Sequence, residues 1–213
     1  MEPFSISTDE EFRGMLAALA DGADDTTRQQ TEARIWKRYG TRGVVLVSDM
    51  CGFSRTTRMH GICYFLAQIE RTRRLIAPEV LRHGGRLLKF EIDNSFCFFP
   101  DVDSALRCAR DLNARVGESN LQSRPEDQIS IAIGIDHGDL LLIDDVDYFG
   151  DPVNTACKLG EDVAAAGEIL VTARALELAT QDLSVVLDRK LARISGIDIE
   201  YARLEFMHAR GRR

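Results

Sequence analysis

The first feature that could do chemistry is a carboxylate at the end of an apolar run. Residues 44–47 are Val, Val, Leu and Val, which predicts a buried β-strand, and Asp49 follows at its end. Gly52 then permits a tight turn. An acid beside a turn rich in backbone N–H groups is suited to hold a divalent cation and the phosphates that the cation carries. An isolated Asp here would more often be a turn or N-cap residue, so the metal interpretation depends on a second acid.

That second acid is Asp93, in a segment that is predicted to form a hairpin. Residues 86–99 have the pattern of two strands joined by a tight turn near Asp93-Asn94. Alternation places one set of side chains toward the core: Leu88, Phe90 and Ile92. It places an ionisable set on the other face: Lys89, Glu91 and Asp93. Taken alone, such a set is often merely solvent-facing.

The third informative segment covers residues 147–159. Asp151 followed by Pro152 is a good helix start, with the acid as the N-cap and the proline at the first position. On that helix Asn154 and Lys158 are four residues apart and share a face. Four other acids are interpreted as solvated or turn residues: Glu91, Asp139, Asp144 and Asp145.

The elements that position these residues follow the order strand, helix, hairpin, helix, strand. This order predicts an α+β fold with a ferredoxin-like antiparallel sheet and helices packed on one face. Apolar spacing predicts a helix from about residue 62, kinked or broken at Pro78 and ended by Gly84-Gly85. Neighbouring strands lie about 5 Å apart. Asp49 and Asp93 are therefore expected to share two cations roughly 4 Å apart, the arrangement used for displacement at phosphorus.

The other predicted elements lie on both sides of the third segment. They are a helix over 103–116, strands over 129–136 and 140–143 with a turn at 137–139, a strand over 168–171, a short helix over 173–180, and strands over 183–189 and 201–206.

Three regions are expected: an N-terminal helical arm over 1–42, a catalytic domain over 43–207 and a basic tail over 208–213. In the arm, residues 11–19 have the pattern of a short amphipathic helix, and 21–31 are polar and loop-like or weakly helical. Gly40 and Gly43 are expected to separate the arm from the first strand. Three side chains are expected to dock the arm on the core or on a second subunit: Ile35, Trp36 and Tyr39.

Composition narrows the class of protein. The chain has 213 residues, enough for one well-filled core, and its net charge of −7 argues against nucleic acid or an anionic membrane as the main partner. We find no apolar run of membrane-spanning length and no signal-peptide core. The five cysteines are scattered, which favours reduced thiols in the cytoplasm over disulfides or a zinc site. The four histidines show no metal-ligand spacing.

Three segments together resemble the signature of class III nucleotide cyclases, the adenylyl and guanylyl cyclase catalytic domains. They are residues 47–54 (VSDMCGFS), 89–93 (KFEID) and 147–158 (DYFGDPVNTACK). They occur in the family's order and internal spacing, and the resemblance runs from about residue 43 to residue 206.

The resemblance implies a role for each matching residue. Asp49 and Asp93 would bind two Mg²⁺ or Mn²⁺ ions, while Lys89 and Asp147 would read the edge of the base. This Lys/Asp combination is the one that selects adenine, whose N1 accepts a hydrogen bond and whose amine donates one. Asn154 would position the ribose. Backbone N–H groups would cradle the phosphates in the segment formed by Met50, Cys51, Gly52, Phe53 and Ser54.

The resemblance also implies a reaction and an assembly. The ribose 3′-hydroxyl of ATP would attack the α-phosphorus, and pyrophosphate would leave, giving 3′,5′-cyclic AMP. In this family the active sites lie between two subunits arranged head to tail. A homodimer would therefore have two equivalent sites, each combining the metal acids of one chain with Lys89, Asp147, Asn154 and Lys158 of the other.

Three departures from the family pattern bear on activity. Lys158 stands where arginine is usual, which keeps the charge but loses the planar fork. Residues 194–196 are Ile-Ser-Gly where the family has a triphosphate-binding lysine, for which Arg193 or Lys190 would have to compensate. Ile92 replaces the usual glycine before the second metal acid. Two alternatives therefore stay open: a weak or inactive cyclase-like module that binds nucleotide or a partner protein, and a cyclase for GTP or a pyrimidine nucleotide.

Overall fold

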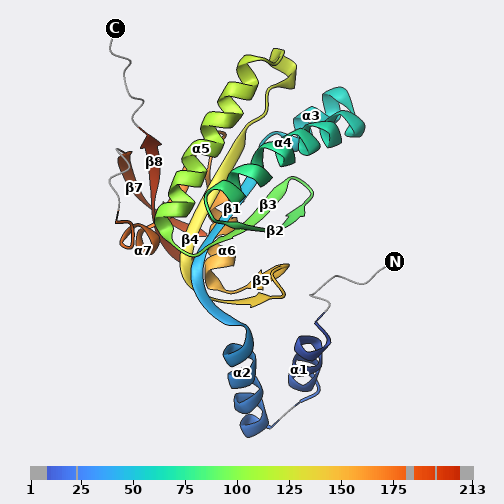
Figure 1. Ribbon diagram of the computed structural model, residues 1–213, viewed down its shortest axis with the longest axis vertical. Coiled ribbons are helices and arrows are strands. Elements are labelled where there is room, and N and C mark those ends of the chain that lie inside the picture. The colour runs from blue at the N-terminus through green and yellow to red at the C-terminus, as the bar shows by residue number, and fades with distance from the viewer. Residues whose placement is uncertain (1–8, 23, 181–184, 195, 207–213) are drawn as a thin grey trace.

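The centre of the molecule is a mixed β-sheet with helices packed on it (Figure 1). The computed structural model describes residues 9–22, 24–180, 185–194 and 196–206. The strands are β1 (Gly40–Met50), β2 (Arg86–Glu91), β3 (Asn94–Phe99), β4 (Ile131–Ile143), β5 (Asp147–Phe149), β6 (Ile169–Thr172), β7 (Val185–Ile194) and β8 (Ile197–Phe206). The helices are α1 (Glu10–Ala20), α2 (Asp25–Tyr39), α3 (Phe53–His60), α4 (Ile62–Arg82), α5 (Val102–Leu121), α6 (Asp151–Cys157) and α7 (Ala173–Leu176), with a 3₁₀ turn η1 (Pro125–Asp127) and a π-helical turn η2 (Lys158–Val163).

The strand order is β2-β3-β1-β4-β6-β8-β7, and β5 pairs with β4. Most neighbours are antiparallel, but β4 and β6 are parallel. The predicted α+β class, a sheet with helices packed on it, is confirmed. β1 lies between β3 and β4 and pairs with both, so the end of β1 meets the β2–β3 hairpin on one side and β4 on the other.

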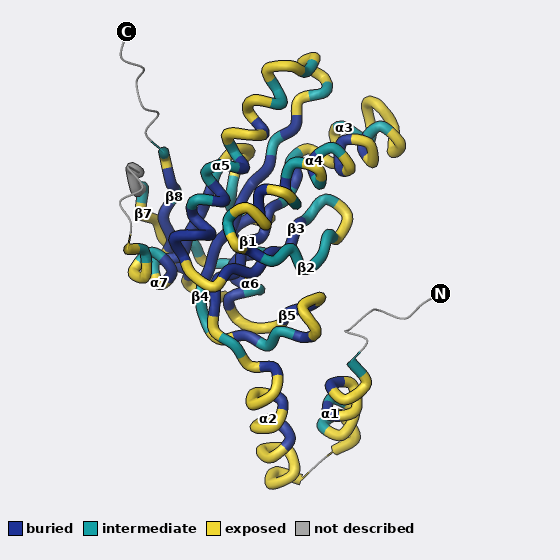
Figure 2. Tube along the Cα trace, in the orientation of Figure 1, coloured by how far each residue is buried: buried dark blue, intermediate teal, exposed yellow. Residues whose placement is uncertain are grey.

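The two faces of the sheet are covered differently. The apolar stripes of α4 and α5 bury one face, and their side chains form the largest core cluster with alternate residues of β1, such as Val44 and Leu46. Val45 and Val47 point to the other face, where they pack with Tyr148 and Ala156 under α6. The dark blue segments in Figure 2 show this burial along the central strands. The expected layer of helices on one face is present, and α6 with η2 adds a smaller layer on the other.

β1 and β4 are longer than the sequence pattern predicts. The predicted turn at 137–139 is wrong, because these residues continue β4 and pair with 42–44 of β1. Gly43 is a position of close packing, whereas a side chain at Gly138 would make only ordinary contact. A Cβ at Gly43 would lie 2.5 Å from the Phe98 ring, and one at Gly138 would lie 3.4 Å from Pro152 Cγ. Gly40 caps α2 and is the first residue of β1, so it lies at the junction of arm and strand as predicted, whereas Gly43 lies inside the strand.

The β2–β3 hairpin forms, but its alternation differs from the prediction. A bulge between Leu87 and Lys89 shifts the register, so Leu88 joins the cluster under α6 while Phe90 packs on the main core, as predicted. Ile92 lies in the turn with φ of 51° and is 68% exposed. The predictions that Leu88 and Ile92 face the core with Phe90 are therefore wrong.

The helical region after β1 also differs in detail. The predicted helix from about residue 62 is confirmed as α4, and a separate helix, α3, precedes it; Gly61 lies between them with φ of 87°. Pro78 neither breaks nor ends α4, which continues to Arg82. Ile76 and Val80, on either side of the proline, are both buried against α5 and the sheet. Tertiary packing therefore outweighs the local effect of the missing N–H.

The N-terminal arm is a pair of helices at one end of the sheet (Figure 1). The predicted helix over 11–19 is confirmed as α1, and of the two predictions for 21–31, loop-like or weakly helical, the helical one holds from residue 25, where α2 begins. Ile35 and Tyr39 are buried with Phe12 against the end of β4, whereas Trp36 is 48% exposed. Two of the three expected docking residues thus contact the core. Residues 1–8 and 207–213, including the basic tail, lie outside the described residues.

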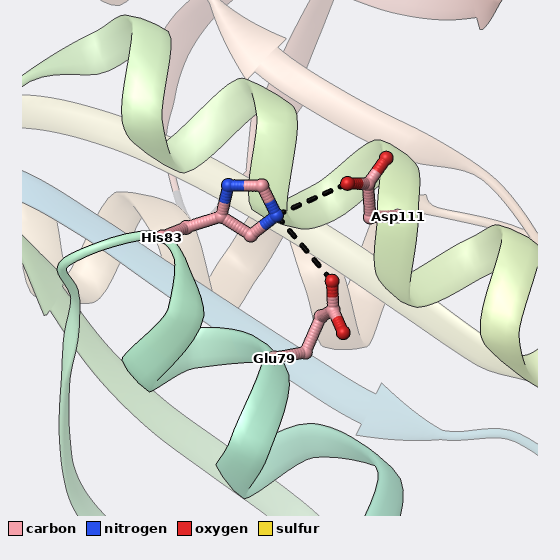
Figure 3. Close-up of side chains that lie close together, drawn as sticks. All are labelled: Glu79, His83 and Asp111. Atoms are coloured by element: carbon pink, nitrogen blue, oxygen red, sulfur yellow. Dashed lines mark hydrogen bonds and ion pairs between the residues drawn. The ribbon is translucent and has the colours of Figure 1, made fainter.

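An ion-pair cluster links α4 to α5 beside the main core (Figure 3). The Nε2 atom of His83 lies 3.1 Å from Asp111 Oδ2 and 3.4 Å from Glu79 Oε1, although Glu79 is only 4% exposed. Arg82 donates to both carboxylates. The guanidinium takes the place that a metal ion would take between the two acids, so this cluster neutralises a buried charge and joins the two helices.

Gly134 of β4 is expected to be essential for stability, because a Cβ there would lie 2.1 Å from Ala156 O and 2.6 Å from Gly160 N. We expect Gly134→Ala to lower the free energy of unfolding by about 1–3 kcal/mol, measured by urea denaturation. Gly117→Ala is the matched control. Gly117 lies in α5 with open space around it, and the substitution should raise stability by about 0.5–1 kcal/mol. Equal effects of both substitutions would contradict the packing argument.

Candidate functional site

Asp49 is the next-to-last residue of β1, which ends at Met50. Because Val45 and Val47 face α6, alternation puts Asp49 on the same face of the sheet. Its neighbour Ser48 is opposite Ser95 of β3, and the two hydroxyls are 2.6 Å apart. Asp93 lies in the turn that leads into β3. The pairing of β1 with β3 therefore brings the turn that carries Asp93 to the end of β1.

The electrostatics of Asp49 show that acids gather here. Burial, together with the nearby carboxylates of Asp93 and Glu161, raises the pKa of Asp49 to about 6. The Met50 N–H partly offsets the effect by donating to the carboxylate. The two predicted metal acids, Asp49 and Asp93, are thus close enough to repel each other, as expected for ligands of an added cation.

Glu161 is a member of the site that sequence reasoning missed. It lies in η2, and its Oε1 accepts a hydrogen bond of 2.9 Å from Asn94 Nδ2 in the β2–β3 hairpin. Burial raises the pKa of Glu161, and the charges of Asp162 and Asp93 add to this. The sequence signal was weak, since Glu161 is one acid of an adjacent pair after a helix. The π-helical turn η2 orients the Glu161 side chain, and such a turn, which is common at functional sites, leaves no periodic pattern of apolar residues in the sequence.

Lys89 and Asp147 meet although 58 residues of sequence separate them. Lys89 Nζ lies 3.0 Å from Asp147 Oδ1 and 2.7 Å from Glu91 Oε1, and it sits 5.0 Å from the centre of the Phe96 ring. Burial alone would lower the pKa of Lys89, but the Glu91 and Asp147 carboxylates more than offset this and raise it. Asp147 is buried at the start of β5. Glu91 is exposed, as predicted for a solvated acid, yet it also pairs with Lys89.

α6 begins at Asp151 and carries Asn154, and Lys158 follows directly after its last residue. Asn154 is exposed, and Lys158, the first residue of η2, is half-buried. The predicted helix start is confirmed, but the N-cap is Gly150 and Asp151 is the first helical residue. The side chain of Asp151 is therefore not the cap; it accepts instead from Arg174 Nη2 at 2.6 Å.

Two of the backbone N–H groups in the expected phosphate cradle, residues 50–54, already have acceptors within the chain. The Cys51 N–H donates to Ser130 O at 2.9 Å, and the Met50 N–H is directed at the Asp49 carboxylate. Gly52 has φ of 96° and caps α3 without a side-chain hydrogen bond. The first N–H groups of a helix have no intrahelical acceptor, so those of Phe53 and Ser54 are suited to receive phosphate oxygens. Burial raises the pKa of the Cys51 thiol to about 11, which argues against a nucleophilic role.

The expected compensation for the missing lysine finds no support within the subunit. Ser195 lies outside the described residues. Lys190 pairs with Asp188 at 3.2 Å, and Arg193 pairs with Asp198 at 3.8 Å. Both belong to β7, at the edge of the sheet opposite to the β2–β3 hairpin. They are therefore remote from Asp49 of the same chain.

Two general expectations can be compared with the structure. All five cysteines are free thiols, in keeping with the absence of a disulfide pattern. None of the helices in the described part of the chain combines the length and the apolar character that a bilayer crossing requires.

Comparisons with known proteins point to one family. No protein-family model matches the chain. A putative adenylate cyclase 3 of Rhizobium meliloti (strain 1021) is 29% identical over 129 residues, which are 60% of this chain and 22% of that protein. The chain thus spans about a fifth of the length of this curated relative.

The fold agrees with that sequence match. The crystal structure of an adenylate/guanylate cyclase/hydrolase from Silicibacter pomeroyi superposes with a TM-score of 0.68 and 28% identity, covering 78% of this chain and 96% of that one. The adenylyl cyclase CyaB from P. aeruginosa has the same fold, with a TM-score of 0.62 and 18% identity over 80% of this chain and 97% of that one. The three sequence segments and these similarities in sequence and fold show that the chain resembles class III nucleotide cyclase domains.

Proposed function

We propose that this chain is an adenylyl cyclase that converts ATP to 3′,5′-cyclic AMP and pyrophosphate at the interface of a homodimer. The observation that carries the proposal is the ion pair between Lys89 and Asp147, on the sheet face that also holds Asp49. An ammonium beside a carboxylate offers adenine a donor for N1 and an acceptor for the exocyclic amine. Guanine would require an acceptor, such as Glu, in place of Lys89.

The acids at the end of β1 fit divalent cations. Asp49 and Asp93, with Glu161 beside them, offer carboxylate oxygens, which Mg²⁺ and Mn²⁺ prefer, and their mutual repulsion would be relieved by bound positive charge. Two such ions, when bound, would acidify the ribose 3′-hydroxyl and neutralise the leaving pyrophosphate. The raised pKa of Asp49 makes this acid sensitive to the presence of a cation at neutral pH.

The remaining residues act by positioning and charge. Backbone N–H groups at the start of α3 would hold phosphate oxygens, Asn154 would fix the ribose, and Lys158 would place positive charge near the α-phosphorus. Ile92 and Val146, 68% and 48% exposed, lie in turns beside this face and are apolar, which favours a second subunit covering them. In the dimer, the acids of one chain would work with Lys89, Asp147, Asn154 and Lys158 of the other.

A second candidate is a module that binds nucleotide or a partner without turnover. Lys158 favours it, because a lysine lacks the planar bidentate fork of the arginine that is usual there. Retention of both Asp49 and Asp93 favours the enzyme, since a binding module has no need for two acids that repel each other.

Incubation with each of the four NTPs and Mg²⁺ or Mn²⁺ tests the proposal directly. We expect cyclic AMP and pyrophosphate from ATP, identified by mass spectrometry. Asp93→Ala should abolish the product, whereas Asp198→Ala, a change to an exposed acid of β8, should not. Cyclic GMP or a cyclic pyrimidine nucleotide as the main product would refute the assigned base specificity. Nucleotide binding with no cyclic product from any NTP would support the binding module.

Lys158→Arg is expected to raise kcat by about tenfold, because a bidentate, charge-assisted contact with phosphate stabilises the transition state by roughly 1–2 kcal/mol more than a point charge does. The wild type should be slow and should prefer Mn²⁺, and the variant should depend less on the choice of metal. Equal rates of the two proteins in both metals would show that Lys158 does not limit turnover.

The raised pKa of Asp49 makes a stability prediction for the metal-free protein. Folding disfavours ionised Asp49, so this residue costs no stability below about pH 4 and costs progressively more as the pH rises through about 6. Asp49→Asn should therefore leave stability unchanged at pH 4 and raise it by on the order of 2 kcal/mol at pH 8 in a chelator. Thermal denaturation measures both. Mn²⁺ should then stabilise the wild type but hardly the variant; equal stabilisation of both would place the metal elsewhere.

A further inference from the structure

Asp136 is a fully buried carboxylate that the proposed reaction does not use. It lies in β4 with 0% exposure, and four donors surround it. These are the His137 N–H at 2.8 Å, the Thr172 hydroxyl, Arg174 Nε at 2.8 Å and Arg174 Nη2. A buried charge with this many hydrogen bonds is a rigid point of the scaffold.

Arg174 extends from this point to the helix that carries Asn154. The same Nη2 atom that contacts Asp136 also donates to Asp151 Oδ2 at 2.6 Å. Asp151 is the first residue of α6, and Asn154 follows it within one helical turn. One guanidinium thus connects the interior of the sheet to the start of the helix that bears the proposed ribose-binding amide.

The stability of α6 depends on contacts with the rest of the protein. It has only seven residues, and its N-cap Gly150 provides no side-chain hydrogen bond. A helix this short has little stability of its own. Its inner side packs on β4, where Pro152 lies over Gly138 and Ala156 over Gly134. Its outer flank borders a cleft of about 360 Å³, lined by Asp151, Thr155 and Arg174 on one side and by residues 197–200 on the other.

We propose that Arg174 is a positioning residue that holds α6, and with it Asn154, in the orientation required for catalysis by bridging buried Asp136 to Asp151. This inference rests on the proposed function. The apolar contacts keep α6 on the sheet, and the bridge fixes the end of the helix that faces the cleft. Loss of the bridge would let this end shift, and a displacement of about 1 Å near a reacting group can lower a rate by as much as a hundredfold.

Asp151→Asn isolates the outer half of the bridge, because it leaves the contacts of Asp136 with Arg174 and Thr172 intact. We expect kcat to fall by about tenfold, with KM for ATP and the melting temperature nearly unchanged. Arg174→Lys should have a similar effect, since one ammonium cannot span both carboxylates. Asp139→Asn is the matched control. It removes another exposed aspartate that pairs with an arginine, Arg42, but it does not contact α6 through its side chain.

A double-mutant cycle separates positioning from general stabilisation. If the bridge acts through Asn154, Asp151→Asn should lower kcat by less than about twofold in an Asn154→Ala background. A loss of the same size in both backgrounds, or no loss in the single variant, would overturn the inference.

Hydrogen exchange tests the bridge without activity. The amides of α6 should exchange about tenfold faster in Asp151→Asn than in Asp139→Asn. Unchanged exchange would also overturn the inference. If the wild type made no cyclic nucleotide, the proposed function would fail, and the exchange measurement would still decide whether the bridge holds α6.

Discussion

The backbone of α6 and η2 lies directly on the backbone of β4, and the rest of the site depends on this contact. It requires glycine at two positions. A Cβ at Gly134 would lie 2.1 Å from Ala156 O, and one at Gly160 would lie 3.1 Å from Gly134 N and 3.2 Å from Val47 O. Because both side chains are absent, η2 approaches β1 and β4 closely. This approach brings Glu161 to the hairpin end of β1 and leaves Asn154 exposed on the outer side of α6.

One face of the sheet carries two regions that differ in charge, an acidic one at the end of β1 and a balanced one around Lys89. At the end of β1, burial first and the charges of neighbouring carboxylates such as Asp93 second raise the pKa values of Asp49 and Glu161. A few residues away along β2, Lys89 is fully compensated by Glu91 and Asp147. The first region is suited to attract added cations, whereas the second is already balanced and is suited to recognise a neutral base through hydrogen bonds. The two functions therefore require different local charge, and β3 lies between β1, which carries Asp49, and β2, which carries Lys89.

The sequence predicted the features that depend on local pattern. Residues 44–47 could only form a buried strand, and the Asp151-Pro152 pair marked the start of α6. Features that depend on tertiary contacts were not predictable in the same way. The bulge at Leu88 sends this side chain to the opposite face from Phe90, and Gly43 suggested a break when it reflects close packing against Phe98. The position of Glu161 depends on a π-helical turn, which leaves no periodic signal.

Two buried acids in this fold show how one physical solution can serve different purposes. Glu79 in α4 and Asp136 in β4 are both almost inaccessible to solvent, and each is paired with an arginine whose side chain is about half exposed. An unpaired buried carboxylate would destabilise the fold, so each arginine is required for stability. The difference lies in the second acid that each guanidinium reaches. Arg82 reaches Asp111 and joins two long helices that already share a core. Loss of that ion pair would therefore change the position of either helix little. Arg174 reaches Asp151 on a helix of seven residues beside a cleft, where a single ion pair can decide the position of a functional side chain.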